Sequence, residues 1–250
     1  REDRVASMQA HRGPVVGLAM KPSSTNIERD DAETTNAYVA TIGEDNNLKV
    51  FSVPQGECLY STKLPHAVSE LKWSPEGGGE LVVAGVNGFV SMWTFDFTER
   101  GAPSASMAST NALVGFPQSV DVTAIDFDRT GEFVAAGASD GSICVWDVAH
   151  ATLDLVIPAG LNAHKRAITC LAFHPTRGRA QLTSGSLDGD GRVWDLVAEA
   201  TETPGECLHT LRWNSGAIID VNYLSCGRLI VTSTAMSALK GASRPLNRLL

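Results

Sequence analysis

Short apolar runs alternate with polar turn signals along most of the chain. The pattern is clearest in residues 131–147 and 180–195, where a strand-like run, an Asp-Gly turn, a second run and a closing Trp-Asp pair follow one another. An Asp-Gly pair between two such runs is typical of a β-hairpin, because a tight turn needs backbone angles that Asp and Gly tolerate. The pattern therefore predicts strands, and its recurrence indicates a repeat protein.

The spacing within these hairpins is constant. A turn residue stands six positions before an aromatic residue in Asp45 and Phe51, Asn87 and Trp93, Asp140 and Trp146, and Asp188 and Trp194. The first strands of successive cycles begin about 50 residues apart, at Val15, Val68, Val122, Ile168 and Ile218. Four short strands in a cycle of this length are the signature of a β-propeller blade. A solenoid or a sandwich stays possible, but neither accounts for the repeated spacing.

These hairpins resemble those of the WD-repeat family of β-propellers. Trp146-Asp147 and Trp194-Asp195 match the Trp-Asp pair that ends the third strand of a family blade. In the family, a hydrogen-bonded tetrad joins a His before the first strand, a Ser or Thr on the second, the turn Asp and the Trp. The resemblance implies this structural role for His11, Thr41, Asp45, Trp93, Asp140, Trp146, His164, Ser184, Asp188 and Trp194.

The match to the tetrad is uneven along the chain. The fourth blade has every part, with Ser184 or Ser186 as the hydroxyl. The first blade has Phe51 where the Trp would stand, and the second has Asn87 in its turn. The third has no matching His, and alanines replace its hydroxyls. We therefore expect most blades to depend on apolar packing against their neighbours.

The expected fold is all-β, a propeller of four-stranded antiparallel blades spanning residues 1–235. The predicted blades are 11–63, 64–116, 118–157 and 164–211, with a partial fifth at 214–235. Residues 4–10 are expected to be the outer strand that closes the ring. Family propellers usually have seven blades, so we expect part of a larger propeller, or one completed by further segments or a partner. A closed five-bladed ring is the alternative.

Two segments do not match a blade strand. Residues 97–111 are rich in Ser and Ala without a period, which predicts a loop, and residues 112–116 are then the fourth strand of the second blade. Residues 236–250 have Met236 and Ala242 where the turn Asp and the Trp should stand. This C-terminal segment is expected to be divergent and to lack the third and fourth strands.

Composition narrows the function classes. The 250 residues include 28 acidic and 20 basic ones, for a net charge of −8. A surface that binds nucleic acid is basic, so direct nucleic-acid binding is not expected. The five cysteines are odd in number and include no C-x-x-C pair, which indicates reduced thiols. Without an apolar run long enough to span a membrane, we expect an intracellular protein, cytoplasmic or nuclear.

The sequence offers no catalytic constellation, so we predict no catalytic residue, no metal and no cofactor. His164 and His174 flank Cys170, but about 3.3 Å of rise per strand residue puts the two His near opposite faces. Asp188 and Asp190 hint at calcium, yet their short loop supplies too few oxygens. The alternative is a propeller-fold enzyme or ligand-binding protein that uses the central channel, whose inner strands are mostly apolar.

The resemblance implies a non-catalytic scaffold that binds proteins or peptides within a multiprotein complex. Family contacts concentrate on the face that carries the tetrad turns. The matching residues here are Glu44, Val86, Asp121, Thr123, Ser139, Thr169 and Leu187. We expect them to accept a short peptide whose Lys or Arg enters near Glu44 and Asp121; a solvated rim is the alternative. The loops 23–36, 97–111 and 197–205 lie on the opposite face, as a second docking surface or as tolerated insertions.

Overall fold

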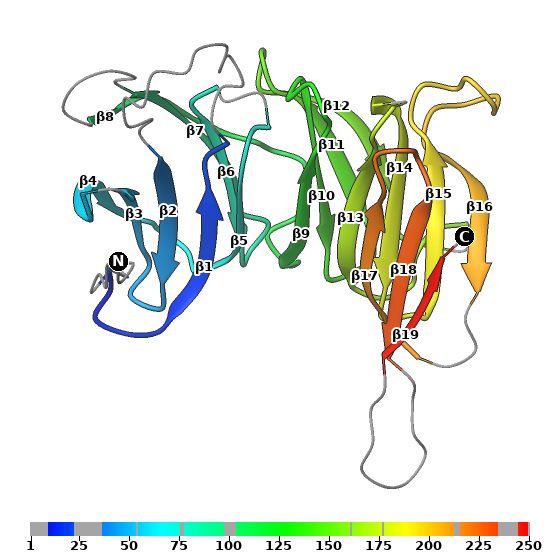
Figure 1. The fold of residues 1–250 in the computed structure, drawn as a ribbon. Coiled ribbons are helices and arrows are strands. Elements are labelled where there is room, and N and C mark those ends of the chain that lie inside the picture. The colour runs from blue at the N-terminus through cyan, green and yellow to red at the C-terminus, as the bar shows by residue number, and fades with distance from the viewer. Residues whose placement is uncertain are drawn as a thin grey trace, which may run out of the picture.

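The computed structural model describes residues 10–22, 37–53, 55–75, 78–97, 104–160, 162–176, 178–212, 216–234 and 245–249. Within these ranges the regular elements are all strands, and they form five antiparallel sheets (Figure 1). The described part of the chain holds no helix long and apolar enough to cross a membrane. The predicted all-β fold of four-stranded antiparallel sheets is confirmed.

Each sheet is a meander of consecutive strands. The first holds β1 (Val15–Met20), β2 (Tyr38–Gly43), β3 (Asn47–Ser52) and β4 (Glu57–Lys63). The second holds β5 (Val68–Trp73), β6 (Glu80–Gly85), β7 (Val90–Phe97) and β8 (Ala105–Ala112). The third holds β9 (Val122–Phe127), β10 (Phe133–Ala138), β11 (Ile143–Asp147) and β12 (Thr152–Ile157). The fourth holds β13 (Ile168–His174), β14 (Gly178–Ser186), β15 (Asp190–Asp195) and β16 (Glu206–Arg212), and the fifth holds β17 (Ile218–Tyr223), β18 (Leu229–Thr234) and β19 (Pro245–Leu249).

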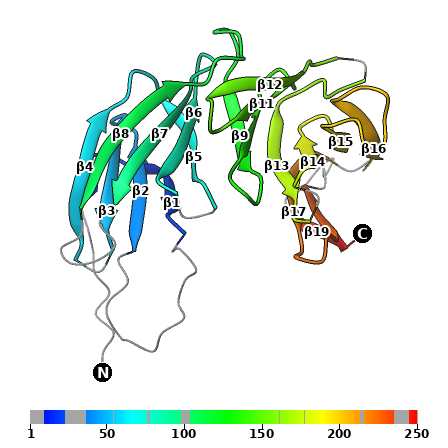
Figure 2. The ribbon, with the colours of Figure 1, turned by 90° about the horizontal axis from the view of Figure 1, so that it is seen from above.

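The sheets are arranged around their first strands. β1 contacts β5, β5 contacts β9, β9 contacts β13, and β13 contacts β17. Seen from above, the five sheets fan out in an arc that is open between β1 and β17 (Figure 2). The expected total of seven blades and the predicted blade boundaries stay predictions.

The hairpin turns owe their shape to the acidic residue that the sequence repeats. One carboxylate oxygen of Asp45, Asp140 and Asp188 accepts the backbone N–H two residues further on, at 3.1, 2.9 and 2.9 Å. Gly141, in the left-handed region at φ 98°, lies so close to the carbonyl of His164 that an added Cβ would stand 2.7 Å from its oxygen. The Asp therefore shapes the turn, and the Gly lets it approach the next sheet.

An apolar cluster fills each junction between neighbouring sheets. One cluster lies between the first and second sheets, around Ile42, Leu48 and Leu81. The others lie between the second and third sheets, the third and fourth, and the fourth and fifth. Since the second and third strands have apolar residues on both faces, the second, third and fourth sheets each pack against two neighbours, and the first and fifth each pack against one among the described residues.

The first strand is the exception to this burial. Val15, Leu18 and Met20 of β1 are 49%, 62% and 57% exposed. The residues at the same register positions in the next three sheets are at most 8% exposed: Val68, Leu71 and Trp73; Val122, Ile125 and Phe127; Ile168, Leu171 and Phe173. Each of those sheets has a preceding sheet to cover these positions. No sheet among the described residues precedes β1, so its apolar side chains are left open.

The fourth strand of the second sheet lies earlier than predicted. Residues 112–116 were expected to form it and 97–111 to form a loop, but β8 runs from Ala105 to Ala112. Its side chains are almost all exposed, and it pairs with β7 from Phe97–Ala105 to Ser91–Ala112. Backbone hydrogen bonds hold this outer strand, so Ser and Thr serve there as well as apolar residues.

The C-terminal segment also departs from its prediction. Residues 236–250 were expected to lack a third strand, but β19 pairs with β18 from Ile230–Leu249 to Thr234–Pro245. The absent turn Asp and Trp misled the prediction, because antiparallel pairing requires only backbone donors and acceptors. The predicted closing strand at residues 4–10 lies outside the described residues, apart from Ala10.

Candidate functional site

The turns between second and third strands gather on one face of the arc, at the lower side of Figure 1. We call it the tetrad face. In each of the first four sheets, the residue before the turn Asp or Asn donates its backbone N–H to a carbonyl just ahead of the first strand. These bonds run from Glu44 to Pro14, Val86 to Ala67, Ser139 to Asp121 and Leu187 to Ala167, at 2.8–3.0 Å. The backbone of this face is thus fixed by the same bond four times.

The fourth sheet brings all its tetrad residues together. His164 Nδ1 lies 3.0 Å from Asp188 Oδ2, and His164 Nε2 lies 2.7 Å from Ser184 Oγ. Trp194 Nε1 donates to the same Oγ at 2.7 Å. Burial alone would raise the pKa of Asp188, but the bond to His164 and the amides of Asp190 and Lys165 outweigh it and hold that pKa well below its usual range. The tetrad is a buried, satisfied network that joins β14, β15, the turn between them and the linker before β13.

The first sheet has three of the four tetrad members in place. His11 is hydrogen-bonded to Asp45 at 3.0 Å and to Thr41 at 2.9 Å. Hydrogen bonds from Asn47 and His11 hold the pKa of Asp45 well below its usual range. Phe51, at the Trp position, is buried and adds packing without an N–H donor.

The second and third sheets do not form the complete tetrad. Trp146 Nε1 donates to the carbonyl of Val114 in the preceding linker at 3.0 Å, since Ala136 offers no hydroxyl. Among the described residues, the buried Trp93 Nε1 has no hydrogen-bond partner. Asp140 accepts from the amide and hydroxyl of Ser142. The structure therefore does not bring Trp93, Asp140 and Trp146 into tetrads.

Hydroxyls on the first strands link neighbouring sheets. Ser69, Thr123 and Thr169 occupy the same register position and donate to the carbonyls of Val122, Ile168 and Ile218 in the next sheet, at 2.5, 2.6 and 2.7 Å. Two of them, Thr123 and Thr169, were predicted to contact a partner. Because their hydrogens are used between sheets, these two threonines hold the platform together and have less to offer a ligand.

The other predicted contact residues lie near the surface of the tetrad face. Glu44, Asp121, Ser139 and Leu187 are exposed, whereas Val86 is half-buried. Asp121 Oδ1 accepts the amide of Asn87 from the neighbouring sheet at 3.1 Å. The exposed set is mainly acidic and polar, with Leu187 as its apolar member.

A group of charges on the first strands was not predicted from the sequence. Glu70 Oε2 accepts the amide of Ile125, and Asp126 Oδ2 accepts that of Phe173, each at 2.8 Å. Lys72 Nζ donates to the other oxygen of Asp126. Burial raises the pKa of Glu70 to about 7 and also raises the pKa of Asp126, against the opposing effect of Lys72. Charged residues in otherwise apolar inner strands are the signal that could have identified this group.

Glu70 makes the stability of the chain depend on pH. Its pKa is about 7 in the folded protein against an ordinary 4.5, so the folded state binds the proton more tightly and stability falls as pH rises from 4.5 to 7. Glu70→Gln keeps an acceptor for the Ile125 amide and removes the charge. We expect the variant to gain about 1–3 kcal/mol over the parent in urea unfolding at pH 8 and to match it at pH 4. The exposed Glu132→Gln is the control; equal pH profiles for Glu70→Gln and the parent would contradict the assignment.

The turn of the fourth sheet was weighed as a calcium site. In the described ranges, no group of three or more His, Cys, Asp or Glu side chains is arranged to hold a metal ion. Asp188 faces His164, whereas Asp190 Oδ2 lies 3.6 Å from Arg192 Nη2. The two carboxylates therefore turn to different partners within the protein.

Comparison with known proteins matches the two sheets that carry Trp-Asp. The family model described as WD domain, G-beta repeat matches residues 111–147 and 157–195. Mouse nucleoporin Nup43 (Mus musculus) is 27% identical over 198 residues, which cover 77% of this chain and 47% of Nup43. Nuclear distribution protein PAC1 of Arthroderma benhamiae is 28% identical over 224 residues, which cover 82% of this chain and 42% of PAC1. Subunit I of eukaryotic translation initiation factor 3 from Lodderomyces elongisporus is 24% identical over 195 residues, which cover 74% of this chain and 51% of that subunit.

The chain spans about half the length of these relatives. Among solved structures, the β-propeller domain of Cps50 (Swd1) from Myceliophteria thermophila superposes with a TM-score of 0.64 at 12% identity, over 97% of this chain and 76% of that domain. This likeness concerns the fold. The two matched stretches are therefore WD repeats, and the fold as a whole is that of a β-propeller.

Proposed function

We propose that this chain is a non-catalytic scaffold that binds other proteins or peptides within a multiprotein complex. The observation that carries the proposal is the repeated backbone bond that fixes four turns of the tetrad face. The backbone of such a surface is in place before a partner arrives, so binding costs little backbone ordering. Glu44, Asp121 and Leu187 are exposed there and are our candidates for the contact with a partner.

The relatives support this role. A nucleoporin and a subunit of a translation initiation factor are both similar to this chain over about three quarters of its length. These names also fit the intracellular location that we propose. The fold alone does not select among complexes.

The buried acids and thiols are arranged for structure rather than for catalysis. Glu70 and Asp126 each accept a backbone amide from the next sheet. Burial raises the pKa of Cys144 to about 12 and that of Cys170 to about 11, so neither thiol is available as a thiolate near neutral pH. These features favour the scaffold over an enzyme that uses the central channel.

The acidic surface of the tetrad face suggests a basic partner segment, and charge reversal tests it. We expect Glu44→Lys combined with Leu187→Lys to lower the yield of co-purified partner proteins at least about fivefold, because both substitutions add positive charge to a surface that is expected to meet a basic segment. Quantitative mass spectrometry after affinity purification measures the yield. Glu57→Lys, exposed at the start of β4 on the opposite face, should leave it unchanged. Full recovery of every partner by the tetrad-face variant would refute this surface.

A further inference from the structure

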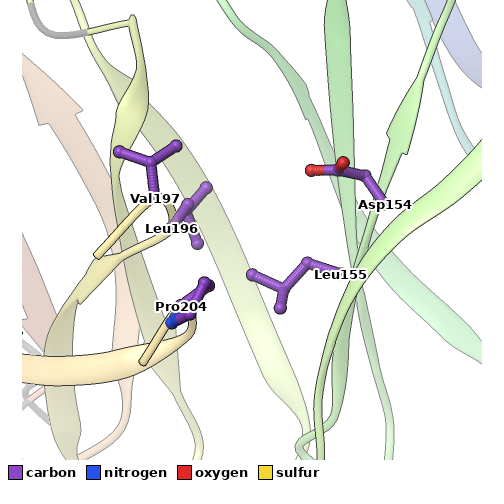
Figure 3. A pocket seen from close by; sticks show the side chains of 5 residues that line it. All are labelled: Asp154, Leu155, Leu196, Val197 and Pro204. Atoms are coloured by element: carbon purple, nitrogen blue, oxygen red, sulfur yellow. The ribbon is translucent and has the colours of Figure 1, made fainter. Parts of the chain in front are cut away.

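A cavity lies between the third and fourth sheets, on the face opposite the tetrad turns. Its volume is about 270 Å³, and it is lined by Asp154, Leu155, Leu196, Val197 and Pro204. Leu155 projects from β12 of the third sheet toward Leu196 and Pro204 of the fourth (Figure 3). One wall therefore comes from β12 and the other from the loop that joins β15 to β16.

The loop wall is rigid because a buried carboxylate organises it. Asp195 Oδ1 accepts the amide of Glu199, and Oδ2 accepts the amides of Ala200 and Thr201, at 2.7–3.1 Å. Its carbonyl accepts the amide of Gly205 at 2.6 Å. Asp195 is 1% exposed, so these bonds are shielded from water. The cavity exists before any ligand binds.

Four of the five lining residues have apolar side chains, the fifth is Asp154, and the surroundings are acidic. Residues 130–164 and 193–211, which contribute the two walls, contain no Lys or Arg. They do contain Asp154 at the cavity and the exposed Glu199 and Glu202 on the loop. Apolar side chains of Leu155, Leu196 and Val197 beside an acidic rim complement an apolar side chain flanked by positive charge.

The size of the cavity suits a single side chain. Pockets for drug-sized ligands measure about 300–1,000 Å³, and this one, at about 270 Å³, is smaller. One bulky side chain of a peptide fits such a volume, with the rest of the peptide lying across the rim.

We propose that this cavity binds a short peptide segment of a partner protein, taking in one large aliphatic or aromatic side chain whose neighbours are Lys or Arg. This site is separate from the tetrad face. It rests on the proposed scaffold role only because it requires a protein partner. A WD-repeat scaffold would then hold partners on both faces.

The test uses two fluorescent peptides and the whole chain. One carries the sequence Gly-Ser-Arg-Leu-Arg-Ser-Gly, and the other replaces both Arg with Glu. We expect saturable binding of the first by fluorescence anisotropy and at least about tenfold weaker binding of the second. Val197→Lys puts a positive charge into the cavity wall and should weaken binding of the first peptide at least about tenfold. Val114→Lys, 76% exposed in the linker between β8 and β9, adds the same charge elsewhere and should leave binding within about twofold of the parent.

Each outcome decides the proposal. A matching melting temperature shows that Val197→Lys is folded, and Leu155→Ala offers a second variant that weakens binding without a new charge. No binding of the basic peptide, equal binding of both peptides, or unchanged binding by Val197→Lys and Leu155→Ala would each overturn the site. None of these results bears on the tetrad-face variants, so the two proposals fail independently.

Discussion

Leu71→Ala is expected to lower the free energy of unfolding by about 2–5 kcal/mol, whereas Leu18→Ala changes it by less than about 1 kcal/mol. Both leucines occupy the same register position on a first strand, pairing with Val83 and Thr41 respectively. Leu71 is 6% exposed and packs in the cluster around Ile42, so truncation leaves a cavity there. Leu18 is 62% exposed and loses little contact. Urea unfolding of the two variants and the parent measures the difference.

Leu171→Ala provides a third member of the series. It stands at the same position in the fourth sheet, is 7% exposed and should behave like Leu71→Ala. The substitution is identical at all three sites, so intrinsic propensity cancels and only the covering sheet differs. An equal loss for Leu18→Ala would mean that β1 is covered in solution. In that case the arc would be closed by something beyond the five described sheets.

The repeat could be predicted because the inner part of each sheet is encoded in residue types. Second and third strands are largely buried on both faces and mostly apolar, and the turns between them carry Asp or Asn with a left-handed residue nearby. Because these local signals recur with a constant spacing, each repeat strengthens the prediction made for the others. The tetrad of the fourth sheet was predictable for the same reason, since His164, Ser184 and Asp188 each stand at a defined place in the cycle.

Outer strands escape this kind of prediction. β8 carries Ser, Thr, Asn and Ala along an exposed edge, and backbone pairing with β7 supplies its stability. The segment that forms β19 lacks the turn Asp and the Trp that would have predicted a strand there. Where a strand buries little, its sequence is weakly constrained, and no apolar alternation remains to be detected.

Residues that act between sheets were missed because their partners lie about 50 positions away in the sequence. Thr123 looks like a surface residue until the carbonyl of Ile168 is placed beside its hydroxyl. Glu70 looks like a solvated charge until the amide of Ile125 is found at its carboxylate. Such roles follow from the stacking of one sheet on the next, which no local pattern encodes.

Asp195→Asn is expected to cost about 2–4 kcal/mol of unfolding free energy, whereas Asp147→Asn costs less than about 1 kcal/mol. Both residues are the Asp of a Trp-Asp pair, so the sequence treats them alike. The buried Asp195 accepts four backbone amides and the hydroxyl of Thr201. Asp147, with a side chain 30% exposed, accepts the amide of His150 and contacts its exposed ring. Chemical denaturation of both variants measures the costs.

The difference arises because a carboxylate has two oxygens that accept hydrogen bonds from backbone N–H groups, whereas an Asn side chain has only one. An Asn at 195 presents one acceptor oxygen and turns an NH2 group toward amides that also donate, so buried N–H groups lose their partners. Hydrogen exchange should then speed up at Ala200 and Thr201, and the cavity wall beside Val197 should loosen with them. The amides bonded to Asp195 hold its pKa down to about 2 despite burial, so the parent should lose this stabilisation as pH falls from about 4 toward 2 and the variant should not. Equal costs at 195 and 147 would mean that the loop holds its shape without the carboxylate, and the cavity would then owe its rigidity to packing alone.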